Sequence, residues 1–289
     1  MMKKVIPILL ILIAVVFISC EKEVSSENSG NNGSNLIVGA DCRISKMVYT
    51  DTALNRGLGS IEAVINSLDI VTKITKFDSL SNTIEFIGTP VYTNDTVYIN
   101  PEEYFVVDIN KRISKLHALT DPTDPFSPQF DVDYFYDAAG YLINKFYTFT
   151  GVPGLPFYIV RYTYLGGKLI HMRGNEQVAG VDGDLITDAD INYYDHILPT
   201  RFLYLFPDEE DYSHYNQFFN FGARPTNAPR DITVRYYDPG NVLRDSAVST
   251  FSNYIMSRDN YVLSVQMGGD AQPGIPASAG KLSFSYKCK

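Results

Sequence analysis

The sequence predicts an all-β protein whose antiparallel meander curls into a closed or nearly closed barrel. Tyr, Phe, Val, Ile and Thr favour strands and dominate the periodic segments; the 289 residues include 21 Tyr, 17 Phe and no Trp. Short turns containing Asp and Gly recur between these segments. Cysteines also stand at both ends of the strand-rich region, which predicts that its first and last strands are neighbours.

The N-terminus predicts export. Lys3 and Lys4 precede an apolar run, Val5–Ile18, which is shorter than the roughly 20 residues that span a bilayer. A charged start and a short apolar core are typical of a secretory signal. The run ends at Phe17-Ile18-Ser19-Cys20, which resembles a bacterial lipobox. This resemblance implies that residues 1–19 are a signal peptide and that Cys20 is lipidated; an uncleaved anchor is the alternative.

Residues 20–35 are rich in Ser, Asn and Gly after the initial charged residues, a composition typical of a flexible tether. Residues 36–289 contain no internal linker and are predicted to form one β-barrel-like domain. The residues directly after Cys20 look like the surface-export signals of Bacteroidota lipoproteins. We therefore expect an outer-membrane lipoprotein exposed at the cell surface and held to the membrane by lipid on Cys20. A periplasm-facing orientation is the alternative.

The two remaining cysteines predict a disulfide. An exported protein is in an oxidising compartment. With Cys20 assigned to lipid, Cys42 and Cys288 are left. Cys42 opens the first strand-like segment and Cys288 closes the last, so a bridge would make these strands neighbours and favour barrel closure. Two unpaired thiols are the alternative.

Strand-like runs recur along the whole domain, and several alternate apolar and polar residues as a half-buried strand does. They are Ile44–Tyr49, Ile70–Phe77, Asn82–Ile87, Tyr104–Ile109, Ile113–Leu119, Asp131–Tyr136, Leu142–Phe149, Tyr158–Tyr164, Leu169–Arg173, Arg201–Phe206, Ile232–Tyr237, Ser246–Phe251, Tyr261–Met267 and Leu282–Tyr286.

A weak repeat predicts hairpins. Three segments, Tyr134–Leu142, Tyr162–Leu169 and Tyr236–Leu243, combine Tyr with a Gly-containing turn, and Asn192–Leu198 is a degenerate fourth copy. Asp bonds to its own backbone in such turns, and Gly adopts a positive φ without steric cost. The segments therefore predict antiparallel hairpins.

Three segments do not read as simple strands. Asn55–Leu68 is compatible with a short helix or with a turn into a strand, and Thr120–Gln129 contains three prolines and predicts a loop. The main insertion, near residues 207–230, is a short helix or a loop. Its aromatic residues within Glu209–Phe219 have approximately helical spacing. Such an element would plug or cap the barrel, or cover an open sheet edge.

Together these features resemble a Bacteroidota lipoprotein family of unknown function with a porin-like barrel fold. The resemblance rests on the lipobox, the tether, the opening Cys42–Lys46, the closing Phe284–Cys288, the hairpins and Gly222–Pro229. It implies fold and location but no activity. A membrane pore needs an outward apolar band; because the hairpins mix Lys, Arg, Asp and Asn with apolar residues, we expect a barrel on a tether instead.

The sequence carries no motif that predicts catalysis. The four histidines, at positions 117, 171, 196 and 214, lack metal-ligand spacing. The acidic segment Asp182–Asp190 is the best Ca²⁺ candidate, but it lacks the EF-hand order and is predicted to be a polar loop. We expect no enzyme activity, cofactor or metal. The net charge of −9 also argues against nucleic-acid binding.

Four positions look like O-glycosylation acceptors of exported Bacteroidota proteins: Thr52, Ser79, Thr96 and Ser246, each preceded by Asp and followed by an apolar residue. Glycans there would require exposed loops.

Location and abundant tyrosine favour a surface binding module for a glycan, a peptide or a small ligand. The alternative is a structural or assembly lipoprotein whose barrel offers a surface to a protein partner.

Overall fold

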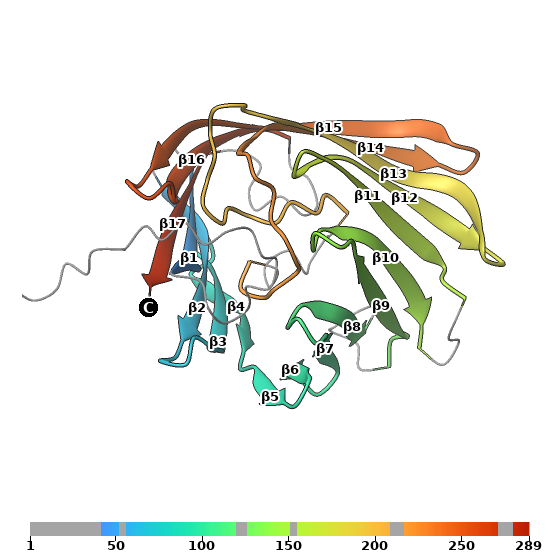
Figure 1. Ribbon diagram of the computed structural model, residues 1–289, viewed down its shortest axis with the longest axis horizontal. Coiled ribbons are helices and arrows are strands. Elements are labelled where there is room, and N and C mark those ends of the chain that lie inside the picture. Colours follow the sequence, from blue (N-terminus) through green and yellow to red (C-terminus); the bar gives the residue numbers. More distant parts are fainter. Residues whose placement is uncertain are drawn as a thin grey trace, which may run out of the picture.

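The chain folds into one 17-stranded antiparallel sheet (Figure 1). The computed structural model describes residues 42–51, 56–119, 126–150, 155–208, 217–270 and 280–288. The strands are β1 (Cys42–Asp51), β2 (Arg56–Ile65), β3 (Val71–Asp78), β4 (Thr83–Gly88), β5 (Val91–Thr93), β6 (Thr96–Asn100), β7 (Glu103–Val107), β8 (Ile113–Leu119), β9 (Gln129–Tyr136), β10 (Leu142–Phe149), β11 (Tyr158–Leu165), β12 (Lys168–Val178), β13 (Val181–Tyr193), β14 (Pro229–Asp238), β15 (Val242–Met256), β16 (Val262–Gly269) and β17 (Gly280–Cys288).

The sheet is a meander whose ends meet. Two runs of strands, β1–β4 and β5–β17, form the meander. Within each run, every strand pairs with the strand that follows it in the chain. The last strand, β17, returns to pair with β1, and Cys42 lies opposite Cys288. These two cysteines are joined by a disulfide of 2.08 Å. The predicted bridge and the predicted adjacency of the first and last strands are therefore present.

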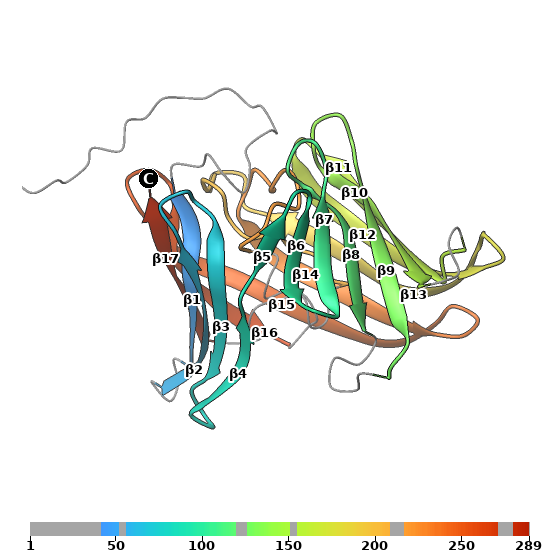
Figure 2. The ribbon, with the colours of Figure 1, turned by 90° about the horizontal axis from the view of Figure 1, so that it is seen from below.

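The wall of strands is interrupted once. In the described residues no register pairs β4 with β5: β4 pairs with β3, and β5 pairs with β6. Only Thr89 and Pro90 separate β4 from β5, and Pro90 has no N–H to donate to a ladder. The ribbon consequently opens between β4 and the strands that follow β5 (Figure 2). The barrel is nearly closed, and full closure is not observed.

Three of the four predicted hairpin segments form hairpins, namely β9–β10, β11–β12 and β14–β15. In the first of them, the Asp137 carboxylate accepts from the Tyr141 N–H at 2.8 Å, and Gly140 has a φ of 89°. The fourth prediction, a hairpin at Asn192–Leu198, is wrong. β13 ends at Tyr193, and the chain then enters the barrel instead of reversing into the next strand.

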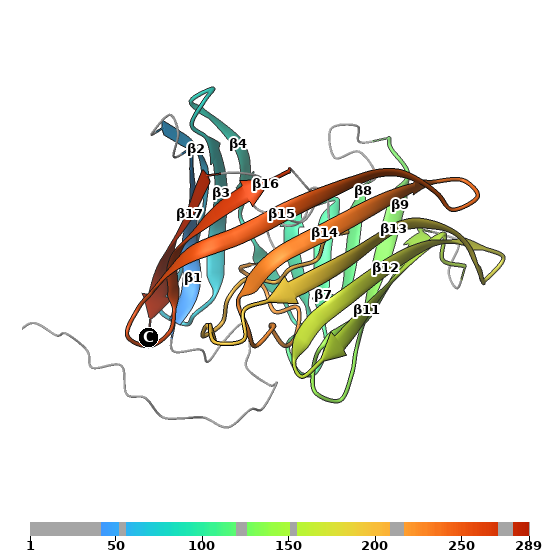
Figure 3. The ribbon, with the colours of Figure 1, turned by 90° about the horizontal axis from the view of Figure 1, so that it is seen from above.

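The described parts of the segment between β13 and β14, residues 194–208 and 217–228, lie inside the barrel, and we call them the plug (Figures 1 and 3). The predicted strand Arg201–Phe206 is wrong, because no strand occurs there. Residues 202–206 are buried on every side, since wall and plug surround them. The described residues of the insertion contain no helix, so it is a loop there. Most of the helix suggested for Glu209–Phe219 lies outside the described residues.

Two other segments differ from expectation. Asn55–Leu68 contains strand β2 and no helix in its described part. The acidic segment Asp182–Asp190, predicted as a polar loop, lies within strand β13. There Ala189 and Ile191 are buried, and Asp188 and Asp190 alternate with them on the opposite face. A half-buried strand whose outward positions carry carboxylates therefore has the same acidic composition as a polar loop, and this is why the prediction was wrong.

Most buried apolar side chains face the plug, and most ion pairs between strands face outward. The buried cluster joins wall residues such as Phe105 and Phe251 to plug residues such as Phe202 and Phe221. Outward-facing ion pairs join neighbouring strands, as in Lys46–Glu62 at 2.9 Å. The described residues include no helix that is both long and apolar enough to cross a membrane.

Candidate functional site

The plug is tied to one end of the barrel, which we call the plugged end. Backbone hydrogen bonds connect it to four hairpin turns: Ile113 N–H to Asn220 O at 2.8 Å, Ala223 N–H to Gly140 O at 2.8 Å, Thr226 N–H to Gly167 O at 3.0 Å, and Thr200 N–H to Asn260 O at 2.8 Å. These turns join β7–β8, β9–β10, β11–β12 and β15–β16. Turns at one end of a meander thus satisfy the backbone of an irregular segment that would otherwise be buried without partners.

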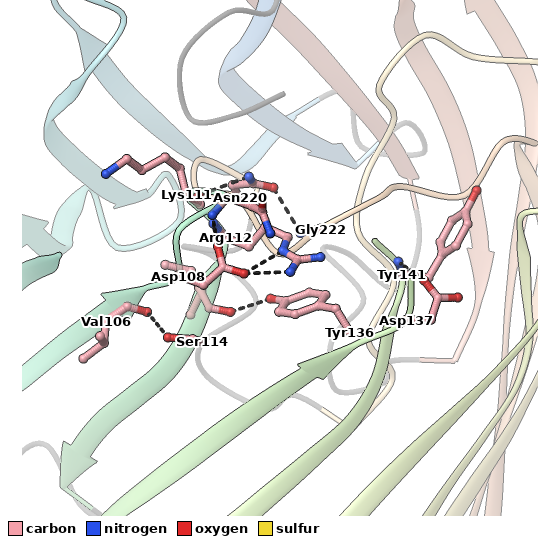
Figure 4. Close-up of polar contacts among 12 residues, drawn as sticks. Val106, Asp108, Lys111, Arg112, Ser114, Tyr136, Asp137, Tyr141, Asn220 and Gly222 are labelled. Carbon is pink, nitrogen blue, oxygen red and sulfur yellow. Dashed lines mark hydrogen bonds and ion pairs between the residues drawn. The ribbon is translucent and has the colours of Figure 1, made fainter. Parts of the chain in front are cut away.

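Figure 4 shows the densest of these attachments, at the β7–β8 turn. The Asp108 carboxylate lies 2.7 Å from Nη2 of Arg112, and the Asn220 amide donates to Lys111 O at 3.1 Å. The Tyr136 hydroxyl donates to Ile113 O at 2.5 Å, below the Arg112 guanidinium. Burial raises the pKa of the Tyr136 phenol well above its ordinary value, so this donor keeps its proton.

Within the plug, one glutamine joins the two described arms. The Gln217 Oε1 accepts from the Tyr204 N–H at 3.0 Å, and its Nε2 donates to Tyr204 O at 3.1 Å. The Tyr204 hydroxyl donates to Gly222 O at 2.9 Å. The side-chain amide of Gln217 therefore satisfies both backbone hydrogen-bonding groups of Tyr204, as a paired strand would. It thereby connects the two described arms of the plug.

A buried ion pair connects the plug to the wall. Lys145 of β10 and Asp208 of the plug have side chains with no exposed surface, and Nζ lies 3.2 Å from Oδ2. The Tyr162 hydroxyl donates to Asp208 Oδ1 at 2.6 Å, and Nζ is 4.6 Å from the centre of the Phe206 ring. The hydrogen bonds and the aromatic ring thus offset part of the hydration free energy that both charged groups lose on burial.

An aromatic cluster extends from this pair toward the end of the barrel opposite the plugged end. The Tyr147 hydroxyl donates to Asp208 Oδ2 at 3.4 Å. The Tyr147 ring is 5.3 Å from Tyr158, and Phe149 stacks on Phe157 at 4.3 Å. With Phe130, whose ring is 6.3 Å from Tyr147, these residues form what we call the rim cluster.

The rim cluster lies on the inner face of the wall. Tyr147 reaches the plug, and Phe149, two residues further along β10, shares its face. Phe149 is 45% exposed at the last residue of β10. The site therefore offers the exposed ring of Phe149 beside partly buried rings. Lys145 and Asp208 lie beneath these rings with no exposed surface, and we call them the polar floor. Stacking surfaces combined with a few fixed polar groups suit a ligand that is itself part apolar ring and part hydroxyl.

The predicted site residues are not brought together, except for the Cys42–Cys288 pair. Cys20 and Thr52 lie outside the described residues. Ser79 and Ser246 are exposed, and Thr96 is half-buried with its hydroxyl 3.2 Å from Asp95 Oδ1.

The three histidines in the described residues each contact a different partner. His117 lies 2.8 Å from Asp131, His171 lies 2.9 Å from Asp190, and the His196 ring packs beside Tyr194. His214 lies outside the described residues. No group of three His, Cys, Asp or Glu side chains suited to a metal ion occurs in the part of the chain that the structure describes.

The rim cluster and its polar floor were not predicted. The single sequence signal is Lys145, a charged residue that alternates with Tyr147 and Phe149 on one face of an otherwise aromatic strand segment. A buried lysine requires a partner, yet Asp208 is 63 residues away and belongs to a segment without periodicity. Sequence spacing does not connect them.

No protein-family model and no curated protein sequence matches the chain. Two solved structures are similar to it, both described as porin-like proteins. The one from Bacteroides uniformis has 10% identity and a TM-score of 0.57, covering 84% of this chain and 98% of that one. The one from Bacteroides vulgatus has 12% identity and a TM-score of 0.51, covering 86% and 99%. These likenesses show that the chain has a porin-like β fold.

Proposed function

We propose that the protein is a cell-envelope lipoprotein that binds a glycan at the rim cluster. The observation that carries the proposal is the pair of stacked rings, Phe149 and Phe157, on the inner face beside the hydroxyl of Tyr147. Sugar rings have apolar faces that pack on aromatic rings and hydroxyls that bond to polar groups. The porin-like neighbours from Bacteroides support a place in the envelope, and the lipobox-like Cys20 supports attachment by lipid.

Two features favour a binding module over a channel. The plug packs apolar rings, including Phe202 and Phe221, into the buried cluster inside the barrel. The outer face carries ion pairs such as Arg161–Asp182 at 2.7 Å. A membrane-spanning barrel has the opposite arrangement, with a polar inside and an apolar band outside.

Calorimetric titration with soluble oligosaccharides of glucose, mannose and N-acetylglucosamine tests the proposed ligand class. We expect Phe149→Ala and Phe157→Ala to weaken binding by about twofold to tenfold each, since one lost ring contact is worth about 0.5–1.5 kcal/mol. Phe135→Ala is the matched control: Phe135 is 43% exposed and its ring lies 4.7 Å from that of Phe146, but it lies on the other face of the wall from the buried Tyr134. Equal losses in all three variants, or no binding to any oligosaccharide, would contradict the proposal.

Metabolic labelling with a palmitate analogue tests the anchor separately. We expect the full-length protein to take up label and to partition with membranes, and Cys20→Ala to lose both properties. Retention of label by Cys20→Ala would rule out this cysteine as the lipidated residue.

The second candidate is the structural or assembly lipoprotein that offers a surface to a protein partner. The specific observation in its favour is a strand edge, that of β4, which carries exposed aliphatic side chains.

A further inference from the structure

Among the described residues, strand β4 has one edge that no other strand pairs with, which we call its free edge. Its residues pair with β3 alone, from Thr83 opposite Asp78 to Gly88 opposite Ile74. No register in the described residues pairs its other edge, which borders the opening in the wall (Figure 2). Such an edge presents a row of backbone N–H and C=O groups that an added strand would satisfy.

The edge strand β4 exposes apolar side chains to solvent. Ile84 is 55% exposed and Ile87 is 50% exposed. Paired residues share a face of the sheet; Ile84 lies opposite Phe77 and Ile87 opposite Thr75, so the bulge in this ladder places both isoleucines on one face. Proteins usually protect edges with charges, proline or short strands. Here the one charge of β4, Glu85, is already paired with Lys76 at 2.8 Å.

The opening borders a single strand edge. A Cβ on Gly88 would lie 3.4 Å from Cγ2 of Ile99 in β6, so β4 and β6 approach each other at that point. In the described residues β5 pairs with Thr96–Tyr98 of β6, and the ribbon opens between β4 and the strands that follow β5 (Figure 2). A strand added to β4 would lie in this opening.

Local charge indicates the chemistry of the occupant. Lys73 of β3 is exposed and forms no ion pair with another described residue. It shares the face of Thr75, two residues along the strand, and therefore the face of Ile87. A strand added to β4 would bring its residue near Gly88 to the neighbourhood of this cation, where a carboxylate is favoured.

We propose that the free edge of β4 binds a single extended segment of a protein partner, added antiparallel, with apolar residues beside Ile84 and Ile87 and a carboxylate near Lys73. Main-chain hydrogen bonds would provide affinity, and these side-chain contacts would provide specificity. The proposal rests on the second candidate function and does not involve the rim cluster.

A peptide with the sequence of β3 is a suitable probe, because β3 already pairs with β4 in a defined register. The test peptide is the sequence of Val71–Asp78 with Lys73→Glu, and the comparison peptide keeps the lysine. A third peptide carries N-methyl groups at alternate residues and cannot complete the ladder. Binding to the mature protein is measured by fluorescence anisotropy, and its location by hydrogen exchange of the β4 amides.

We expect the Glu peptide to bind at least threefold more tightly than the Lys peptide, and the N-methylated peptide at least tenfold more weakly. Amides of Ile84 and Ile87 gain protection. The Ile84→Lys, Ile87→Lys double variant loses binding, whereas Leu243→Lys, an exposed leucine on another hairpin, does not. Binding without protection of β4, or equal binding of all three peptides, would overturn the proposal. So would a concentration-dependent dimer abolished by the double variant, because a second copy would then cover this edge.

Variants at one site distinguish a failure of the glycan-binding proposal from a failure of the β4-edge proposal. Phe149→Ala is expected to bind the Glu peptide normally, and the β4 double variant is expected to bind oligosaccharide normally. Loss of peptide binding in Phe149→Ala would overturn the assignment to the β4 edge.

Discussion

Glu103 is the clearest source of pH-dependent stability in this protein. It begins β7 with 7% of its surface exposed, and its Oε1 has no hydrogen-bond partner among the described residues. Its Oε2 accepts from the Asn100 amide at 3.1 Å. Burial raises the pKa of Glu103 from 4.5 to about 7, and the hydrogen bond from Asn100 offsets this only in part.

The direction of the effect follows from proton binding. Between pH 4.5 and about 7 the folded state holds a proton on Glu103 that the unfolded state has lost. The free energy of unfolding therefore decreases as pH rises through this window. A shift of this size corresponds to about 3 kcal/mol, at about 1.4 kcal/mol for each pKa unit. The contribution is complete below pH 4.5 and absent above about pH 7.

Glu103→Gln removes the titration and keeps an oxygen for Asn100. We expect the variant to match the parent near pH 4 and to exceed its free energy of unfolding by up to about 3 kcal/mol near pH 8. Guanidinium denaturation of the mature protein at several pH values measures this difference. Glu102→Gln, at the exposed neighbouring position, controls for the loss of one negative charge. Parallel pH curves for the parent and Glu103→Gln would refute the reasoning.

Three further changes test the packing of the barrel. Replacing both Cys42 and Cys288 by Ser opens a loop of 246-residue separation and should lower the free energy of unfolding by up to about 5 kcal/mol; no change in the urea midpoint would mean that the sheet alone holds these ends. Asp208→Asn should destabilise by about 3–5 kcal/mol, because it removes the negative charge of the carboxylate that lies 3.2 Å from the buried Lys145 ammonium. Asp208→Leu combined with Lys145→Met should recover most of that loss in the same assay, and an additive second loss would contradict the pairing. Tyr49→Phe should be neutral or raise the thermal midpoint, since the buried hydroxyl has no partner in the described part of the chain and burying it costs about 1 kcal/mol.

The strands and hairpins were predictable because their signals are local. Alternation over a few residues identifies a half-buried strand, and Gly140 or Gly240 with an Asp two or three residues before it identifies a turn between two of them. The same local reasoning failed for Arg201–Phe206. Its composition matches a strand, but in the plug both sides of the segment are buried, and no strand of the described residues pairs with it.

The candidate sites depend on contacts between distant residues. Lys145 meets Asp208, 63 residues away, only after the meander has closed around the plug. Phe149 and Phe157 meet across the connection between β10 and β11, but the polar groups beneath them come from the distant plug. The free edge of β4 exists because β5 pairs with β6 and not with β4. Neither the Lys145–Asp208 contact nor the free edge of β4 produces a periodic pattern in the sequence. Periodicity shows which face of one element is buried, but it does not show which other element covers that face.

Strand content, most of the hairpins and the pairing of Cys42 with Cys288 could be read from the chain alone, because they follow from side-chain alternation, turn chemistry and cysteine count. Three features needed the folded molecule: the plug lies inside the barrel, the wall opens beside β4, and particular aromatic rings face inward. These features are set by long-range competition for buried apolar surface and for backbone hydrogen bonds, which no local segment encodes alone.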